Sequence, residues 1–184
     1  MEFKQQKISI FGIQKSGKSF LAKKLLQFFD SPVVFAPHRD DYADVARCFV
    51  YVPKDAEREF RGLCNKVLEW AKAGKCDCFC IDEADMVVRG NWDMNPALND
   101  LILNHRHYNL ALIFISRRPQ DIPTKIVESC HYLFIFKLEG ENALKKFRNI
   151  DRAVFDLFPS IEYGKFNFIV KPVGEPPYVN AAIQ

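Results

Sequence analysis

Gly12-Ile13-Gln14-Lys15-Ser16-Gly17-Lys18-Ser19 is the stretch of this sequence that decides its fold. It has the Gly-x-x-x-x-Gly-Lys-Ser/Thr spacing of a phosphate-binding loop, or P-loop. The apolar run Lys7–Phe11 precedes it, and Leu21, Leu25 and Phe29 follow at helical spacing. A strand before the motif and a helix after it are the context in which such a loop holds the phosphates of a nucleotide. The motif therefore predicts a nucleoside triphosphate site.

Each part of the P-loop has a chemical task. Its glycines let the backbone wrap a polyphosphate, so that consecutive N–H groups and the positive end of the helix point at it. Lys18 can reach the β- and γ-phosphates, and the Ser19 hydroxyl can bind magnesium. We therefore expect ATP and Mg²⁺ as cofactors. The residues expected to contact the nucleotide are Gly12, Gln14, Lys15, Ser16, Gly17, Lys18, Ser19 and Phe20.

A second motif is a predicted strand that ends in two adjacent carboxylates, Phe79-Cys80-Ile81-Asp82-Glu83. Asp82 would bind magnesium through water or the Ser19 hydroxyl, and Glu83 would polarise an attacking water. Asp85 is a weaker candidate for either role. Because phosphate kinases need no water-activating group beside the metal ligand, the paired carboxylates favour ATP hydrolysis.

The composition favours one intracellular α/β domain. The chain has 184 residues, 48% of them hydrophobic, which is enough for a substantial core. No apolar run approaches the ~20 residues of a membrane helix, and residues 1–7 lack a signal-peptide core, so we expect a cytoplasmic protein. Cys76, Cys78 and Cys80 have no partner at zinc-ligand spacing. We expect their sulfurs to pack on one face of a buried strand instead of forming a metal site or disulfides.

Strands and helices alternate along the chain, which predicts a mainly parallel central sheet with helices on both faces. The expected strands are 7–11, 32–36, 48–52, 76–81, 110–115 and 131–138, and the expected helices include 56–73, one that opens at Asn95-Pro96, and 122–129. One or two basic helices should follow Gly140. A hairpin over 160–172, with Gly164 at its turn, and an irregular tail from Val173 should end the chain. We expect a single domain with a core over about 6–138 and a C-terminal part over about 139–184.

Hydrolysis also needs a cation against the charge that develops on the γ-phosphate. Arg106 ends the helix before the Leu110 strand, and Arg117 and Arg118 follow that strand. The end of that strand should lie beside the P-loop, which makes Ser116 and Arg117 candidates for sensing the γ-phosphate. Arg106 and Arg117 both remain candidates for an arginine that a neighbouring subunit supplies.

Four segments together resemble the FtsK–HerA superfamily of DNA-translocating ATPases, and most of all the genome-packaging ATPases of tailless double-stranded DNA viruses. These segments are 12–19, 78–83, 104–109 and 113–123. The resemblance implies a RecA-like P-loop core in which Arg106 is the trans-acting arginine. It also implies a sensor glutamine at the position where this chain has Arg117. Sensing could therefore pass to Ser116 or Arg117, or to Gln120 in the following loop.

The resemblance further implies a homo-oligomeric ring, with six subunits favoured, that threads double-stranded DNA while ATP is hydrolysed at subunit boundaries. Capsid vertex or portal-like proteins would be further partners, and a viral protein of this kind would act in the host cytoplasm or with the virion. The net charge of +3 per chain becomes about +18 over six copies, enough to hold DNA phosphates without base specificity. The candidate DNA contacts are Lys145, Lys146, Arg148 and Arg152, unless they simply form a solvated helix face.

Other protein classes share parts of this pattern. A small P-loop kinase would need a lid and an acceptor-binding segment, and the sequence has no clear Arg-rich lid insertion. A morphogenesis or secretion ATPase usually carries a membrane segment, which the sequence lacks. A nucleotide clamp without activity would not need Lys18, Asp82 and Glu83 together. The sequence therefore favours an ATPase coupled to DNA translocation.

Overall fold

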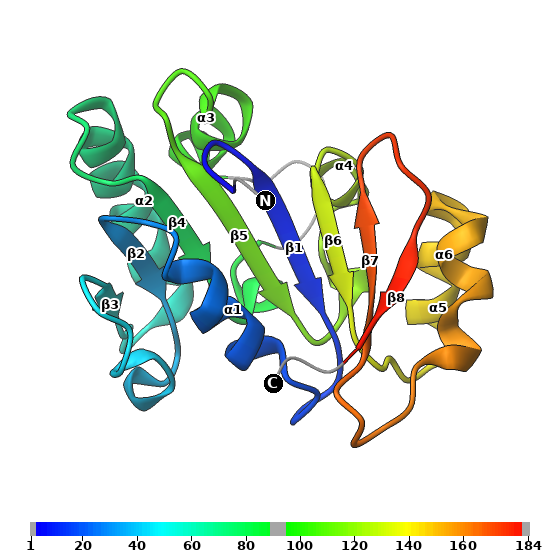
Figure 1. Cartoon of the computed structure of the whole chain (residues 1–184). Coiled ribbons are helices and arrows are strands. Elements are labelled where there is room, and N and C mark those ends of the chain that lie inside the picture. The colour runs from blue at the N-terminus through cyan, green and yellow to red at the C-terminus, as the bar shows by residue number, and fades with distance from the viewer. Residues whose placement is uncertain (1–2, 89–94, 182–184) are drawn as a thin grey trace.

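The computed structural model describes residues 3–88 and 95–181, and its strands form one eight-stranded sheet (Figure 1). The strand order is β3-β2-β4-β5-β1-β6-β7-β8. Strands β1 to β6 pair in parallel, whereas β7 and β8 are antiparallel additions at one edge. The strands are β1 Lys7–Phe11, β2 Pro32–Phe35, β3 Phe49–Tyr51, β4 Cys78–Ile81, β5 Ala111–Ser116, β6 Tyr132–Ile135, β7 Phe168–Pro172 and β8 Tyr178–Asn180.

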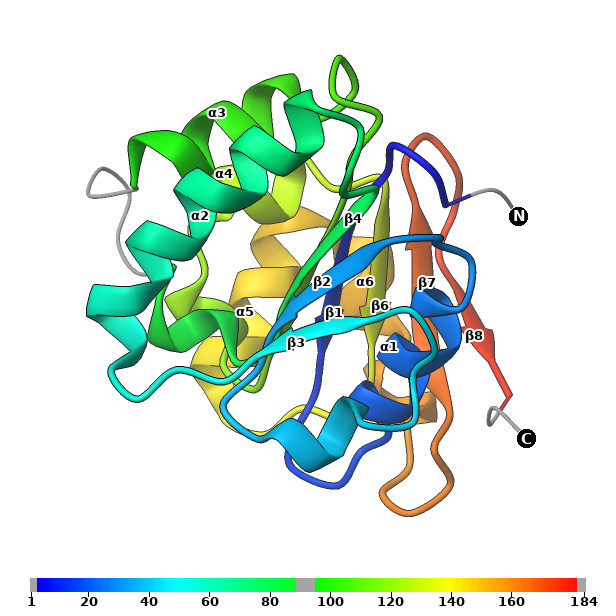
Figure 2. The ribbon, with the colours of Figure 1, turned by 90° about the vertical axis from the view of Figure 1, so that its left-hand side faces the viewer.

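Helices cover both faces of this sheet, but unevenly (Figures 1 and 2). Helix α1 packs on one face, and α2 to α6 pack on the other, so two separate clusters of buried apolar side chains form. The helices are α1 Lys18–Leu26, α2 Ala56–Lys72, α3 Pro96–Asn104, α4 Thr124–Glu128, α5 Glu141–Ile150 and α6 Arg152–Asp156. This arrangement confirms the predicted α/β fold with a RecA-like, mainly parallel core.

Helix α2 illustrates how local sequence sets these elements. The Asp55 carboxylate accepts a hydrogen bond from the Arg58 backbone N–H at 3.2 Å and so caps the first turn. Phe60, Leu63 and Val67 repeat at helical spacing and are buried against the sheet. The helix therefore begins where the capping residue predicts and ends one residue before the predicted Ala73.

The C-terminal hairpin lies later in the chain than predicted. It is formed by β7 and β8, and Gly174, with a φ of 74°, lies in the turn between them. The predicted hairpin over 160–172 and the irregular tail from Val173 are therefore wrong. Gly164 has a φ of 83° but lies in the loop before β7. Gly164 and Gly174 both have positive φ, and they lie on either side of β7. The spacing of the sequence does not indicate which of the two closes the hairpin.

The cysteine prediction is partly wrong. Cys78 and Cys80 pack in the core on the α1 face, but Cys76 lies in the core on the opposite face. Strand β4 begins at Cys78, so strict alternation does not extend back to Cys76.

Within 3–88 and 95–181, no group of three or more His, Cys, Asp or Glu residues could hold a metal ion. None of the described helices combines the length and apolarity needed to cross a bilayer.

Candidate nucleotide-binding site

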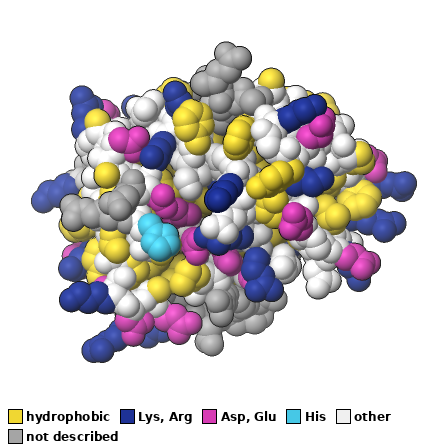
Figure 3. Space-filling model, turned by 90° about the horizontal axis from the view of Figure 1, so that it is seen from below, with side chains coloured by type: hydrophobic (Ala, Val, Ile, Leu, Met, Phe, Trp, Pro, Cys, Tyr) yellow, Lys and Arg dark blue, Asp and Glu magenta, His cyan; other side chains and the backbone are white. Residues whose placement is uncertain are grey.

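The P-loop lies at the carboxyl-terminal edge of the parallel strands, between β1 and α1 (Figure 1). Strand β1 pairs with β5 and β6, which places Phe11 beside Ser116 and Ile135. Strand β4 pairs with β5 on its other side. The segments that follow β1, β4 and β5 therefore meet at one edge. Figure 3 views the molecule from this side, and basic and acidic side chains lie next to one another near the centre of the face.

The glycines of the loop are required by close contacts. A Cβ at Gly12 would lie 2.5 Å from Ser16 Oγ and 2.7 Å from Phe136 Cβ. Gly17 has a φ of 105°, in the left-handed region that side chains rarely adopt. The Ser16 hydroxyl is buried and has no hydrogen-bond partner among the described residues. Because buried polar atoms are normally paired, this orphaned hydroxyl fits a phosphate oxygen as its missing partner.

Next to the loop is a cavity of about 380 Å³ that brings most of the predicted site residues together. It is lined by Gln14, Lys15, Lys18, Ser19, Pro37, His38, Asp41, Asp82, Glu83, Ile115, Ser116 and Arg117. The three residues from 37 to 41 were not predicted, because nothing in their sequence links the loop after β2 to a phosphate site. The strand order brings that loop beside the end of β4.

Lys18 is held inside the loop that precedes it. Its ammonium donates a hydrogen bond to the Ile13 carbonyl oxygen at 2.7 Å. Burial, followed by the nearby Arg117 guanidinium, lowers the pKa of Lys18 to about 8. A polyphosphate would favour the charged form of this lysine, since it would place negative charge beside it.

Asp82 is the most deeply buried carboxylate of the cavity, with 7% of its surface exposed. Its carboxylate accepts hydrogen bonds from the Tyr42 hydroxyl and from the Glu83 backbone N–H, both at 2.8 Å. Burial nevertheless raises the pKa of Asp82, and a divalent cation would stabilise its charged form. Ser19 lines the same cavity, so the residues present fit a magnesium ion held by Asp82, Ser19 and nucleotide phosphates.

Glu83 and Arg117 form an ion pair at the ends of β4 and β5. Glu83 has a φ of 50°, a conformation uncommon outside glycine, directly after the last residue of β4. Ser116 is buried, and its hydroxyl accepts a hydrogen bond from the Arg118 backbone N–H at 3.0 Å. Arg117 therefore lies where it can contact Glu83 or a γ-phosphate.

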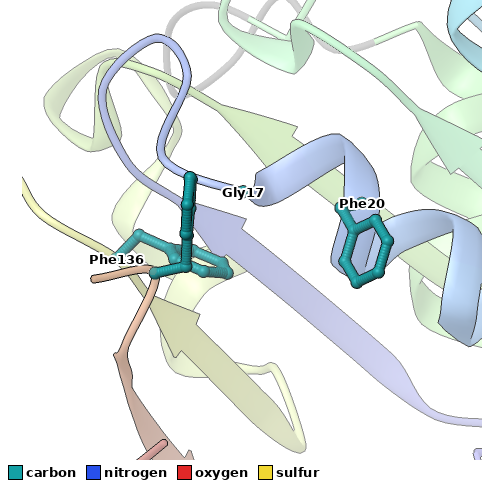
Figure 4. A pocket seen from close by; sticks show the side chains of 4 residues that line it. Gly17, Phe20 and Phe136 are labelled. Carbon is teal, nitrogen blue, oxygen red and sulfur yellow. The ribbon is translucent and has the colours of Figure 1, made fainter. Parts of the chain in front are cut away.

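An apolar pocket of about 310 Å³ adjoins the P-loop and is lined by Gly17, Phe20, Phe136 and Phe166. Figure 4 shows the Phe20 and Phe136 side chains on either side of Gly17. Phe20 and Phe166 are 45% and 48% exposed, although large aromatic side chains usually bury more of their surface. An aromatic pocket beside a phosphate loop offers a stacking surface for a nucleotide base.

Sequence reasoning missed Phe136 and Phe166. Phe136 follows β6, and its ring lies against Gly17 because β6 is the neighbour of β1. Phe166 comes from the loop before β7, which antiparallel pairing with β6 brings to the same edge of the sheet. For Phe166, a weak signal in the sequence is that this large aromatic residue follows Gly164 and Lys165 in a loop.

Arg106 is not part of this cavity. It lies in the turn between α3 and β5, at the edge of the sheet opposite the P-loop (Figure 1). Its guanidinium contacts the His131 ring, just before β6. Arg106 could therefore reach a nucleotide only in another copy of the chain.

The basic residues of α5 and α6 lie outside the cavity as well. Lys145, Arg148 and Arg152 are exposed, and the Arg148 guanidinium lies 5.6 Å from the centre of the Phe155 ring. Lys146 is half-buried and donates a hydrogen bond to the Ile122 carbonyl, and burial lowers its pKa. Among these four, Lys146 already has a structural role.

Solved structures share this fold at low sequence identity. The DNA-packaging ATPase B204 from Sulfolobus turreted icosahedral virus superposes with a TM-score of 0.87 at 17% identity, over 99% of this chain and 100% of B204. The genome-packaging NTPase B204 from Sulfolobus turreted icosahedral virus 2, in complex with ATP-gammaS, gives 0.80 at 18% identity over 98% of both chains. VirB4 of Thermoanaerobacter pseudethanolicus gives 0.76 at 12% identity, over 97% and 89%. Neither a protein-family model nor a curated protein matches the sequence.

Proposed function

We propose that this protein is an ATPase that moves double-stranded DNA, as a viral genome-packaging motor does. One observation carries the proposal: Lys18, Asp82 and Glu83 line one cavity together with Arg117. The Ser16 hydroxyl of the adjoining P-loop has no hydrogen-bond partner within residues 3–88 and 95–181. The fold shared with the B204 packaging enzymes supports the DNA substrate.

In this proposal the triphosphate lies along the P-loop and the base enters the pocket between Phe20 and Phe166. Ser19 and Asp82 would hold Mg²⁺, which would neutralise charge on the phosphate oxygens. Glu83 accepts a proton from the attacking water, whose oxygen bonds to the γ-phosphorus as the bond to ADP breaks. Lys18 and Arg117 balance the charge that develops on the γ-phosphate.

The proposed assembly is a ring of identical copies, with six favoured. Arg106 lies too far from its own cavity to act there, so a neighbouring copy would receive it. Summed positive charge would hold the DNA backbone through contacts without base specificity. Lys145, Arg148 and Arg152 are the exposed candidates for such contacts.

The coupling to DNA is tested by the ATPase rate with and without duplex DNA, from about 50 mM to 200 mM salt. DNA should raise the rate, and this increase should fall steeply with salt, because counterions compete for the same contacts. The Lys18→Ala variant is the control for contaminating ATPases. A rate that neither DNA nor salt changes would contradict translocation and favour a morphogenesis or secretion ATPase, whereas a phosphorylated small-molecule product would indicate a P-loop kinase.

The ring arrangement is tested by mixing two inactive variants. Arg106→Ala copies keep an intact cavity, and Glu83→Gln copies keep an intact Arg106 edge. If Arg106 acts in trans, the mixture should hydrolyse ATP faster than either variant alone. Some of its interfaces would join the intact cavity of an Arg106→Ala copy to the intact Arg106 of a Glu83→Gln copy. A mixture no faster than the sum of its parts would contradict action in trans.

A further inference from the structure

Strand β2 and the segment that follows it hold Asp82 at two points. The Asp82 backbone N–H donates a hydrogen bond to the carbonyl oxygen of Phe35, the last residue of β2, at 2.8 Å. Further along the chain, the Tyr42 hydroxyl donates to Oδ2 of the Asp82 carboxylate at 2.8 Å. The other carboxylate oxygen, Oδ1, accepts from the Glu83 backbone N–H. Each oxygen of this carboxylate therefore has one donor from the protein.

Tyr42 is buried, although it belongs to the irregular connection between β2 and β3. It is 1% exposed, it ends the short 3-10 helix Arg39–Tyr42, and it shares the apolar cluster on the α1 face with Ala36 and Cys80. A phenylalanine would fill the same space without bringing a polar atom into this core, and a buried hydroxyl needs an acceptor. The acceptor of this hydroxyl is Asp82, so the hydroxyl has a role at that carboxylate.

The same segment lines the nucleotide cavity and contacts α1. Its residues on the cavity wall are Pro37, His38 and Asp41. Asp44 forms an ion pair with Lys23 of α1 at 2.8 Å, and Val45 is buried in the core on the α1 face. Helix α1 also carries Ser19, the other residue proposed to hold the metal. The segment therefore connects the two elements from which the protein ligands of the metal would come.

We propose that Tyr42 is a positioning residue for the divalent cation, which it reaches only through the carboxylate of Asp82. The inference rests on the proposed function and adds to it a residue that is not among those lining the cavity. A carboxylate has about four acceptor positions, so one hydrogen bond to each oxygen leaves the others for a metal ion or its water. The hydroxyl of Tyr42 fixes the orientation in which these remaining positions meet the cavity.

A pair of matched variants isolates the hydroxyl. Tyr42→Phe removes only the donor to Asp82 and keeps the buried ring. Tyr51→Phe is the control, because its hydroxyl donates to Glu59 at 2.7 Å and Tyr51 does not line the cavity. The probe is the non-hydrolysable analogue AMPPCP, whose affinity is measured by calorimetry in excess Mg²⁺ and again in EDTA.

We expect a loss that depends on the metal. In Mg²⁺, Tyr42→Phe should bind AMPPCP about tenfold or more weakly, because loss of a hydrogen bond to a ligating carboxylate typically costs 10–100-fold in metal affinity. In EDTA it should bind like the wild type, since the P-loop is intact. Tyr51→Phe should match the wild type in both conditions. Equal losses of Tyr42→Phe with and without the metal would mean that the hydroxyl only anchors the segment, and would overturn the inference.

The Mg²⁺ dependence of hydrolysis provides a second readout. Tyr42→Phe should need about tenfold more Mg²⁺ for half-maximal turnover, whereas its kcat at saturating Mg²⁺ should approach that of the wild type. A misfolded cavity would lower kcat at every Mg²⁺ concentration. A low kcat that added Mg²⁺ does not restore would therefore contradict the positioning role.

Failure of this inference is distinguishable from failure of the proposed function. If DNA raises the ATPase rate of the wild type, but Tyr42→Phe has the wild-type dependence on Mg²⁺, only the role of Tyr42 is wrong. If Tyr42→Phe shows the loss specific to Mg²⁺ while DNA leaves the ATPase rate unchanged, the inference stands and DNA translocation fails. If Mg²⁺ does not strengthen AMPPCP binding to the wild type, the metal site and the inference both fail.

Discussion

The Glu83 carboxylate is ion-paired with the Arg117 guanidinium inside the cavity that Lys18 lines. The two residues come from the ends of the neighbouring parallel strands β4 and β5, so the sheet itself sets their approach. A γ-phosphate in this cavity would compete with Glu83 for Arg117. Nucleotide binding would then release Glu83 for the role of water activation that we propose for it.

The first prediction concerns Glu83. Glu83→Gln should bind ATP with near-normal affinity but hydrolyse it about 10²–10⁴ times more slowly, because the amide cannot accept the proton of the attacking water. Equilibrium binding and single-turnover hydrolysis measure the two effects separately. Asp85→Asn is the matched control. A large loss in Asp85→Asn with near-normal turnover in Glu83→Gln would assign the base to Asp85.

The second prediction concerns Arg117. Arg117→Ala should lower kcat by about tenfold or more, since a cation beside the γ-phosphate is lost even though Glu83 becomes free. Arg117→Gln, which introduces the residue that the resembled family carries here, should retain more activity because an amide N–H can still donate. Arg118→Ala serves as the control, because Arg118 is exposed and paired with Asp121 at 3.1 Å. A higher turnover rate in Arg117→Ala would mean that the Glu83–Arg117 ion pair inhibits hydrolysis and that Arg117 does not assist it.

The third prediction concerns the binding of the nucleotide base. Phe166→Ala should weaken ATP binding by about five- to a hundredfold, in line with 1–3 kcal/mol per stacked base. Binding of inorganic triphosphate should not change, because it reaches only the P-loop. Phe28→Ala removes another exposed ring, which does not line the pocket. If both Phe variants bind ATP like the wild type, the base lies elsewhere.

The fourth prediction is a pH dependence of stability. Burial lowers the pKa of His105 from 6.5 to about 4, and its Nδ1 lies 3.1 Å from the Leu110 carbonyl oxygen. The unfolded chain therefore binds a proton that the folded chain resists, so this stabilisation is complete above pH 6.5 and is lost as pH falls toward 4. The loss is roughly 3 kcal/mol. Denaturant unfolding should show a flatter pH profile for His105→Asn over this interval, and identical profiles would contradict the assignment.

Sequence patterns alone identified the candidate residues that lie in contiguous motifs. The P-loop and the Asp82-Glu83 pair are contiguous motifs, and the alternation of elements predicted a parallel sheet that brings Ser116 beside Phe11. The residues that were missed reach the site only through tertiary pairing. Tyr42 bonds Asp82 from a loop forty residues away, and Phe166 arrives through the antiparallel strand β7.

The errors have a similar physical origin. Gly164 and Gly174 both have positive φ, and only the pairing of β7 with β8 makes the second one the hairpin turn. Cys76 continues the alternating pattern of β4 in sequence, but the strand begins after it, so its sulfur turns to the other core. Local periodicity does not determine where a strand starts.

If Arg106 acts at the phosphate loop of a neighbouring copy, as proposed, the placement of the two at opposite ends of the parallel strands limits how copies can associate. A two-fold dimer uses the same patch on both partners and so cannot join these surfaces in both directions. Head-to-tail stacking can, and it ends either in a closed circle or in an open helical filament. A molecule that carries both Arg106→Ala and Glu83→Gln would then impair two junctions, so the loss of activity in mixed assemblies should exceed the fraction of such double-variant chains.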